Sequence, residues 1–217
     1  MTSEDTPLPT REILLSGINR VIFDLDGTLT LDLKNPDSTL FRDSLLYRKI
    51  EENAIAYITK LQTCSPEEAA TMVLQVKANG GSLRRHVVTT YDIKQEDYFA
   101  NVWNIDPSEV VILRPFVHEV LDQLKEEERT LILLSKAPSI WQQRVFRHFS
   151  INQFDQVFTG EINDDKTIVF DSLAGMYLPS SFLSIGDSPE HDIRPARLRG
   201  MRAHHLTKRN DLAVLLK

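Results

Sequence analysis

Two aspartates separated by one residue end a short apolar run near the start of the chain. The run, residues 21–26, leads into Asp24 and Asp26, and Gly27 and Thr28 follow. In an extended segment, side chains at positions i and i+2 point to the same side, so both carboxylates can face one ligand. Paired carboxylates of this kind can act as nucleophile, as acid and base, or as metal ligands.

Two later apolar runs also end in polar side chains. Residues 131–135 end in Ser135, and residues 182–187 end in Asp187. Continuous apolar runs are typical of strands buried on both faces of a parallel sheet. The carboxyl ends of such strands share one edge, where ligands bind in open α/β sheets. We therefore predict that these two residues converge with the two earlier aspartates.

Three carboxylates gathered at one edge would repel one another unless a cation lay between them. A hard divalent ion with oxygen ligands, Mg²⁺, resolves that repulsion and would also neutralise an incoming phosphate. A plain Asp/Gly turn is the alternative without function. An EF-hand loop starting at Asp24 is excluded by spacing, because its sixth residue is Leu29 and its twelfth is Asn35. No phosphate-binding Gly-x4-Gly-Lys-Ser/Thr sequence is present.

The sequence after residue 110 alternates between strand and helix patterns. Weaker strand candidates lie at residues 156–159 and 202–206, and helical patterns lie at about 116–127, 139–149, 166–175 and 192–199. This alternation predicts an α/β fold, a doubly wound Rossmann-like parallel sheet covered by helices.

Residues 31–110 have a different pattern, with apolar residues at helical spacing from Phe41 to Leu61. Ser65 and Pro66 begin a helix that stops at residues 79–81, Asn-Gly-Gly. Further helices are predicted at residues 82–91 and 96–103, and no strand is predicted here.

The chain is therefore divided into an α/β core, residues 17–30 and 111–217, and an all-helical insert, residues 31–110. Residues 1–16 are predicted to be a loosely held tail.

The order of these motifs resembles that of the haloacid dehalogenase (HAD) superfamily of phosphohydrolases. Residues 24–29, Asp-Leu-Asp-Gly-Thr-Leu, are similar to its first motif, and Ser135 after a strand is similar to its second. Lys166 near a helix start resembles the third, and residues 186–192 fit the Gly-Asp-x4-Asp form of the fourth. The resemblance spans about residues 17–217, and the helical insert lies where this superfamily often has a cap over the active site.

The resemblance implies a role for each motif residue. Asp24 would attack phosphorus and form an aspartyl-phosphate, and Asp26 would protonate the leaving alcohol and then activate water. Ser135 and Lys166 would hold the phosphoryl oxygens. Asp24, the main-chain carbonyl of Asp26, and Asp187 would bind Mg²⁺.

Four further residues complete the predicted site. Thr28 and Lys136 join the phosphate-binding set, while Asp192 and Ser188 would orient neighbouring groups. Lys136 stands where related enzymes usually have Asn, and it either strengthens anion binding or points away from the site.

Each of these roles has a structural alternative. Ser135 could instead bridge into the helix opened by Pro138, and Lys166 taken alone would be a solvated helix residue. Asp192 could be the N-cap of the next helix.

An acid at Asp26 favours phosphate ester cleavage, because a departing alcohol needs a proton and a departing halide does not. Residues 79–83 and 134–138, with 144–149, resemble the pyrimidine 5′-nucleotidase-like branch, which implies a nucleoside 5′-monophosphate as substrate. A sugar phosphate, phosphoglycolate and phosphomutase chemistry are the alternatives. A non-catalytic binding module that kept the fold is the rival from another class.

The insert offers only weak hints of specificity. Residues 84–86, Arg-Arg-His, could hold an anion, and Trp103 or Tyr98 could stack on a base, but a solvated helix face and a core position are the alternatives. Cys64 is interpreted as structural.

Composition limits the class of protein. The 217 residues are 41% hydrophobic and 26% charged, which excludes a disordered or fibrous chain. The net charge of −6 gives no reason to expect nucleic acid or an anionic membrane as partner. A single cysteine and an acidic start without an apolar run predict a cytoplasmic protein. The resemblance implies a small phosphorylated metabolite as its partner. The oligomeric state is left open.

Overall fold

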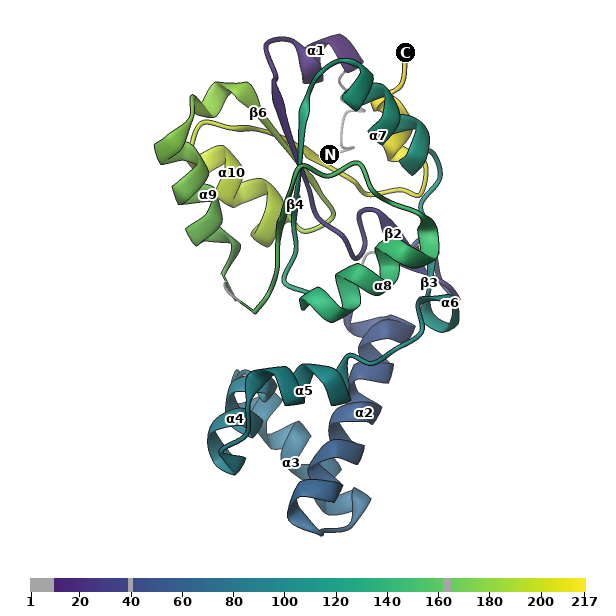
Figure 1. Cartoon of the computed structure of the whole chain (residues 1–217), viewed down its shortest axis with the longest axis vertical. Coiled ribbons are helices and arrows are strands. Elements are labelled where there is room, and N and C mark those ends of the chain that lie inside the picture. Colours follow the sequence, from purple (N-terminus) through teal and green to yellow (C-terminus); the bar gives the residue numbers. More distant parts are fainter. Residues whose placement is uncertain (1–9, 39–40, 162–164) are drawn as a thin grey trace, which may run out of the picture.

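A five-stranded parallel sheet forms the centre of the computed structural model, which describes residues 10–38, 41–161 and 165–217 (Figure 1). The strand order is β5-β4-β1-β6-β7, with every neighbouring pair parallel. The strands are β1 (Arg20–Phe23), β4 (Thr130–Leu134), β5 (Gln156–Phe158), β6 (Phe182–Gly186) and β7 (Arg202–His205). The three strong strand predictions are confirmed, and they are the three central strands.

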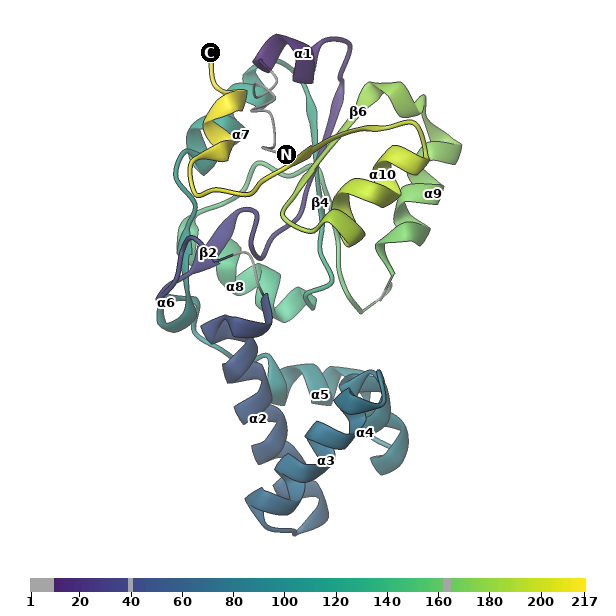
Figure 2. The ribbon, with the colours of Figure 1, turned by 180° about the vertical axis from the view of Figure 1, so that it is seen from behind.

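Helices cover both faces of the sheet, as the continuous apolar runs require. Figures 1 and 2 show α9 (Lys166–Met176) and α10 (Arg194–Leu198) on one side and α7 (Val117–Glu126) and α8 (Ser139–Phe149) on the other. Successive residues of β1 enter opposite cores, with Ile22 in one and its neighbours on both sides in the other. The residues of β1 that enter these cores, Val21, Ile22 and Phe23, are therefore all apolar.

Three short 3₁₀ or π-helical turns complete the core: η2 (Pro179–Ser181), η3 (Pro189–Ile193) and η4 (Asp211–Leu215). The expected helix over 192–199 is thus divided between η3 and α10.

The helical insert is a separate bundle below the sheet edge (Figure 1). It contains η1 (Phe41–Asp43), α2 (Leu45–Gln62), α3 (Pro66–Ala78), α4 (Leu83–Tyr91), α5 (Gln95–Val102) and α6 (Pro107–Val110). Its own apolar core comes from α2 to α5. The predicted helix start at Ser65 is a capping box, because Ser65 accepts from the Glu68 amide and Glu68 accepts from the Ser65 amide.

The expectation that residues 31–110 contain no strand is wrong. A two-stranded antiparallel sheet pairs β2 (Thr30–Asp32) with β3 (Val111–Leu113), where the chain enters and leaves the insert. Strands of three residues carry little periodicity, and these two lie outside the alternation of strands and helices that indicated the equally short β5. The division of the chain at residues 31 and 110 stays a prediction.

The expectation of a loose tail is wrong for residues 10–16. They contain the helix α1 (Arg11–Leu15), capped by Thr10, and Leu14 and Leu15 are buried in the main core. Arg11 donates to the main-chain oxygen of Leu215 at 2.8 Å, which fixes α1 against η4. Residues 1–9 lie outside the described residues.

Within the described residues, no helix has the length and apolar character needed to cross a membrane.

Candidate active site

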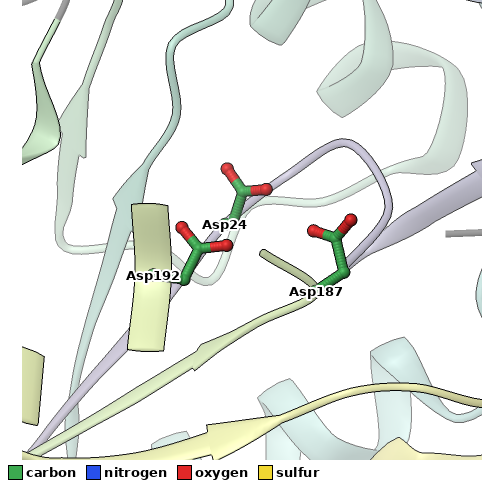
Figure 3. A group of neighbouring side chains, drawn as sticks. All are labelled: Asp24, Asp187 and Asp192. Carbon is green, nitrogen blue, oxygen red and sulfur yellow. The ribbon is translucent and has the colours of Figure 1, made fainter. Parts of the chain in front are cut away.

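Three side chains from the predicted set meet at the carboxyl edge of the central strands. Asp24 follows β1, Asp187 follows β6, and Asp192 lies on η3. One carboxylate oxygen from each lies within 4.8 Å of the others, and Figure 3 shows the three groups around one small region. Ser135 follows β4, the other neighbour of β1, so it reaches the same edge.

Lys166 lies between two of these carboxylates. Its Nζ atom is 2.6 Å from Asp24 Oδ1 and 2.6 Å from Asp192 Oδ1, and its side chain is 5% exposed. Burial lowers the pKa of Lys166, but the two carboxylates raise it by more, so the ammonium stays charged. A solvated helix residue, the alternative for Lys166, is therefore wrong.

The negative charge of the acidic side chains still exceeds the single positive charge of Lys166. Burial raises the pKa of Asp24 to about 7, and Asp192 and Asp187 add to the rise, while Lys166 opposes it. Burial and the charge of Asp192 raise the pKa of Asp187 to about 6. A further cation would relieve this repulsion, and an all-oxygen donor set suits a hard divalent ion.

Asp26 is held by other partners. Trp141 Nε1 on α8 donates to its two carboxylate oxygens at 3.0 and 3.2 Å, and Thr30 donates to Oδ1 at 3.3 Å. Burial raises the pKa of Asp26 to about 7, although both hydrogen bonds lower it. A carboxyl group with such a pKa can both give and take a proton near neutral pH.

The reasoning that one extended strand orients Asp24 and Asp26 is wrong. β1 ends at Phe23, and the carbonyl of Leu25 accepts from the amides of residues 28, 29 and 30, so Asp26 lies in a tight turn. Side-chain partners, and not the period of a strand, set the direction of its carboxylate.

The Thr28 hydroxyl forms two hydrogen bonds within the protein. It donates to Asp187 Oδ1 and accepts from the Asp187 amide, both at 3.1 Å, and the side chain is fully buried. A hydroxyl has one hydrogen to donate, so none is left for a phosphate oxygen. The geometry favours a role for Thr28 in holding Asp187, in place of the expected phosphate contact.

Ser135 and Ser188 hold local structure at the site. Ser135 Oγ accepts from the Ala137 amide at 3.1 Å, which is the bridging alternative, and its own hydrogen meets no acceptor among the described residues. Ser188 caps η3, and its amide donates to Asp192 Oδ2 at 3.1 Å. Asp192 is thus held from two sides, and its alternative role as an N-cap is wrong.

Lys136 is exposed at the rim of the site. Its Nζ atom lies 3.3 Å from both ring nitrogens of His191. Burial and the nearby Lys166 charge lower the pKa of Lys136, while Asp165, Asp192 and Asp24 oppose the shift. Lys136 also contributes to the lining of a cavity formed mostly by residues of the insert.

A cavity of about 210 Å³ lies between the insert and the core, next to Lys136. Aromatic rings form much of its wall, and the remaining lining residues are mostly charged: Tyr47, Tyr98, Phe99, Trp103, Glu51, Lys77, Arg84 and Lys136. Arg84 on α4 donates to the Gly160 carbonyl of the core at 2.9 Å. A smaller cavity of about 40 Å³ adjoins Asp26 and Asp187.

Sequence reasoning missed several residues that shape the site. Trp141 carries no motif signal, because it lies 115 positions from its partner Asp26. His205 Nε2 lies 2.8 Å from the Asp187 carbonyl. Arg114 donates hydrogen bonds to main-chain carbonyls of the turn after β1. Nothing in the local pattern identifies these long-range contacts.

Replacing Lys166 with Met tests the charge balance at the carboxylates. In metal-free protein above neutral pH, we expect Lys166→Met to lower the free energy of unfolding by about 3–5 kcal/mol, because it leaves buried charges unpaired. Added divalent metal should restore part of this loss. Urea denaturation with and without chelator measures both effects.

Lys125→Met is the matched control, since Lys125 forms a salt bridge of 2.6 Å with Asp155 and both side chains are partly exposed. It should cost less than about 1 kcal/mol. Equal losses in the two variants would show that Lys166 does not balance a buried cluster.

Comparisons with known proteins agree with this fold and motif order. A family model described as haloacid dehalogenase-like hydrolase matches residues 18–198. A HAD phosphatase from Thermococcus onnurineus has 18% identity and a TM-score of 0.61, with 87% of this chain and 86% of that chain covered. A predicted phosphoglycolate phosphatase from Haemophilus somnus has 19% identity and a TM-score of 0.55, with 89% and 87% covered.

A HAD family enzyme from Bacteroides thetaiotaomicron, solved as an aspartate-to-alanine variant with magnesium and inorganic phosphate, has 18% identity and a TM-score of 0.55. The match covers 92% of this chain and all of that chain. No curated protein matches the sequence significantly. Structures at these identities share the fold, whereas the family model spans most of the sequence and includes all four motifs. The chain therefore belongs to the haloacid dehalogenase-like hydrolases.

Proposed function

We propose that this hydrolase is a Mg²⁺-dependent phosphatase that cleaves a small phosphomonoester through an aspartyl-phosphate on Asp24. The observation that carries the proposal is the position of Asp24, 2.6 Å from the Lys166 ammonium and next to an acid whose pKa is about 7. These are a nucleophile, an electrostatic partner for the phosphoryl oxygens and a proton carrier, which are the groups that phosphoryl transfer requires.

The reaction divides into two balanced steps. A carboxylate oxygen of Asp24 bonds to phosphorus while the bond to the alcohol oxygen breaks, and Asp26 gives its proton to the departing alcohol. Asp26 then takes a proton from water as the water oxygen attacks phosphorus. This second step releases inorganic phosphate and restores both aspartates.

Asp24, Asp187 and the main-chain carbonyl of Asp26 would hold Mg²⁺, and the Asp192 carboxylate completes the acidic cluster beside them. The bound ion would neutralise negative charge on the phosphate as the nucleophile approaches. Lys166 and the free hydrogen of Ser135 would contact the phosphoryl oxygens, and Lys136 is a further candidate for this contact.

The cavity between insert and core is our candidate for the leaving group. The smaller cavity beside Asp26 holds a few waters at most, whereas about 210 Å³ can take a single ring system. Tyr98 is 3% exposed and contributes to the lining of the larger cavity. The aromatic wall favours a ring-bearing alcohol, so a nucleoside 5′-monophosphate is the proposed substrate.

The residues that line this cavity are also compatible with other substrates. The cationic groups Lys136 and Lys77 at this cavity would also suit a sugar phosphate or phosphoglycolate. The resemblance to the pyrimidine 5′-nucleotidase-like branch stays a prediction, and the substrate panel below tests it directly.

Phosphate release from nucleoside monophosphates, sugar phosphates and phosphoglycolate tests the reaction. Release should require Mg²⁺ and should fall by a factor on the order of 10⁴ or more in Asp24→Asn, which removes the nucleophile. Asp171→Asn is the control, because Asp171 is an exposed acid paired with Arg199. Its rate should equal that of the wild type.

Release that persists in Asp24→Asn would reject the covalent mechanism. No release across the panel from folded protein would favour the binding-module alternative. Mg²⁺-dependent binding of beryllium fluoride, which mimics the phosphoryl group on aspartate, then separates an inactive scaffold from an enzyme with an untested substrate.

Trp141→Phe tests the proton transfer by Asp26. Loss of the indole N–H should misplace the acid and lower kcat/KM about tenfold for an alkyl phosphate, which needs a proton on its leaving group. p-Nitrophenyl phosphate, whose leaving group departs as an anion, should change little. Equal losses for the two substrates would mean that Trp141 acts on some other step.

Tyr98→Phe tests the leaving-group cavity. Removing the hydroxyl should raise KM for the preferred substrate about 2- to 10-fold with little change in kcat, the worth of one neutral hydrogen bond. Tyr91→Phe is the control, because the Tyr91 hydroxyl contacts Met72 Sδ inside the insert. An unchanged KM in Tyr98→Phe would place the leaving group elsewhere.

A further inference from the structure

Arg114, directly after β3, is a buried cation whose hydrogen bonds go to main-chain carbonyls. Its side chain is 2% exposed, and it forms no salt bridge within the part of the chain that the structure describes. Instead, the guanidinium donates four hydrogen bonds to main-chain carbonyls. Burying a charge costs free energy unless it is paired or well bonded, so its surroundings must be shaped to hold it.

One side of the guanidinium holds the turn that follows Asp24. Arg114 Nε donates to the Thr28 carbonyl and Nη2 donates to the Gly27 carbonyl, both at 2.6 Å. The amide of Gly27 donates in turn to the Thr30 carbonyl at 2.9 Å. Gly27 is thus fixed at both its amide and its carbonyl, so the preceding carbonyl, that of Asp26, cannot rotate freely.

The same contacts reach Asp187. Thr28, held through its carbonyl by Arg114, exchanges two hydrogen bonds with Asp187 through its hydroxyl. Gly27 has φ +87°, and a Cβ at this position would lie 2.3 Å from Asp187 Oδ2. The turn and the aspartate are therefore packed against each other without space between them.

The other side of the guanidinium holds the chain after β7. Nη1 donates to the carbonyls of Lys208 and Arg209 at 2.5 and 3.1 Å. Asp211 closes this loop by accepting from the amides of Thr207 and Lys208. Arg114 thus connects the turn after β1 with the loop after β7.

We propose that Arg114 is a positioning residue that sets the affinity of the site for Mg²⁺. It acts through two of the proposed ligands, the Asp26 carbonyl by way of Gly27 and the Asp187 carboxylate by way of Thr28. Only a planar fork with several fixed N–H groups can bind four carbonyls at once, so Lys cannot replace it. This inference rests on the proposed Mg²⁺-dependent function.

Mg²⁺ binding by isothermal titration calorimetry tests the inference without reference to activity. We expect Arg114→Lys to weaken Mg²⁺ binding about 10- to 100-fold, the usual effect of removing a group that orients metal ligands. Mg²⁺-dependent beryllium fluoride binding should weaken in parallel. The KM for substrate at saturating Mg²⁺ should change much less.

Arg202→Lys is the matched control, because Arg202 also clamps main-chain carbonyls, those of Ile13, Leu14 and Ser16, but far from the carboxylates. It should lower stability and leave Mg²⁺ affinity unchanged. Equal Mg²⁺ affinity in Arg114→Lys and wild type would overturn the inference about Arg114 and leave the proposed function unaffected. Failure of the wild type itself to bind Mg²⁺ would overturn the proposed function as well.

Thr28 provides a second test that does not depend on the folding of an Arg114 variant. Thr28→Val breaks the link between Arg114 and Asp187 and should weaken Mg²⁺ binding, while Thr28→Ser keeps the hydroxyl and should restore it. Wild-type Mg²⁺ affinity in Thr28→Val would contradict the proposed path.

Discussion

Repulsion among buried carboxylates is the constraint on which the rest of this structure depends. Asp24, Asp187 and Asp192 lie within a few ångströms of one another in a region that excludes much of the water. One ammonium, that of Lys166, holds two of them together. The fold must supply enough free energy elsewhere to keep this cluster in place, as sites that do chemistry commonly require.

That free energy comes from the layers on either side of the sheet. The central strands bury side chains on both faces, so their carboxyl ends are held by extensive apolar packing. Close contacts with the main chain then bring the charged side chains together. Gly186 is one example, because a Cβ there would lie 2.3 Å from the Asp192 carboxylate. A larger residue would separate Asp192 from Lys166.

The sequence predicts those parts of the site that depend on local pattern. A strand buried on both faces and ending in a polar residue is visible in one stretch of chain, so Asp24, Ser135 and Asp187 could be placed at one edge. Trp141 and Arg114 could not, because their partners lie 115 and about 86 positions away and no local rule connects them. The strands β2 and β3 were missed because each has only three residues and neither belongs to the alternation of strands and helices that indicated the equally short β5.

The pairing of β2 with β3 also has a consequence for the architecture of the chain. Leu31 and Ile112 are register partners, so the polypeptide departs to form the helical insert and returns at almost the same point. The ends of the excursion are already joined by hydrogen bonds, and the entropy of closing such a loop grows only slowly with its length. The bundle can therefore be lengthened, shortened or exchanged in evolution with little disturbance to the sheet that positions the carboxylates.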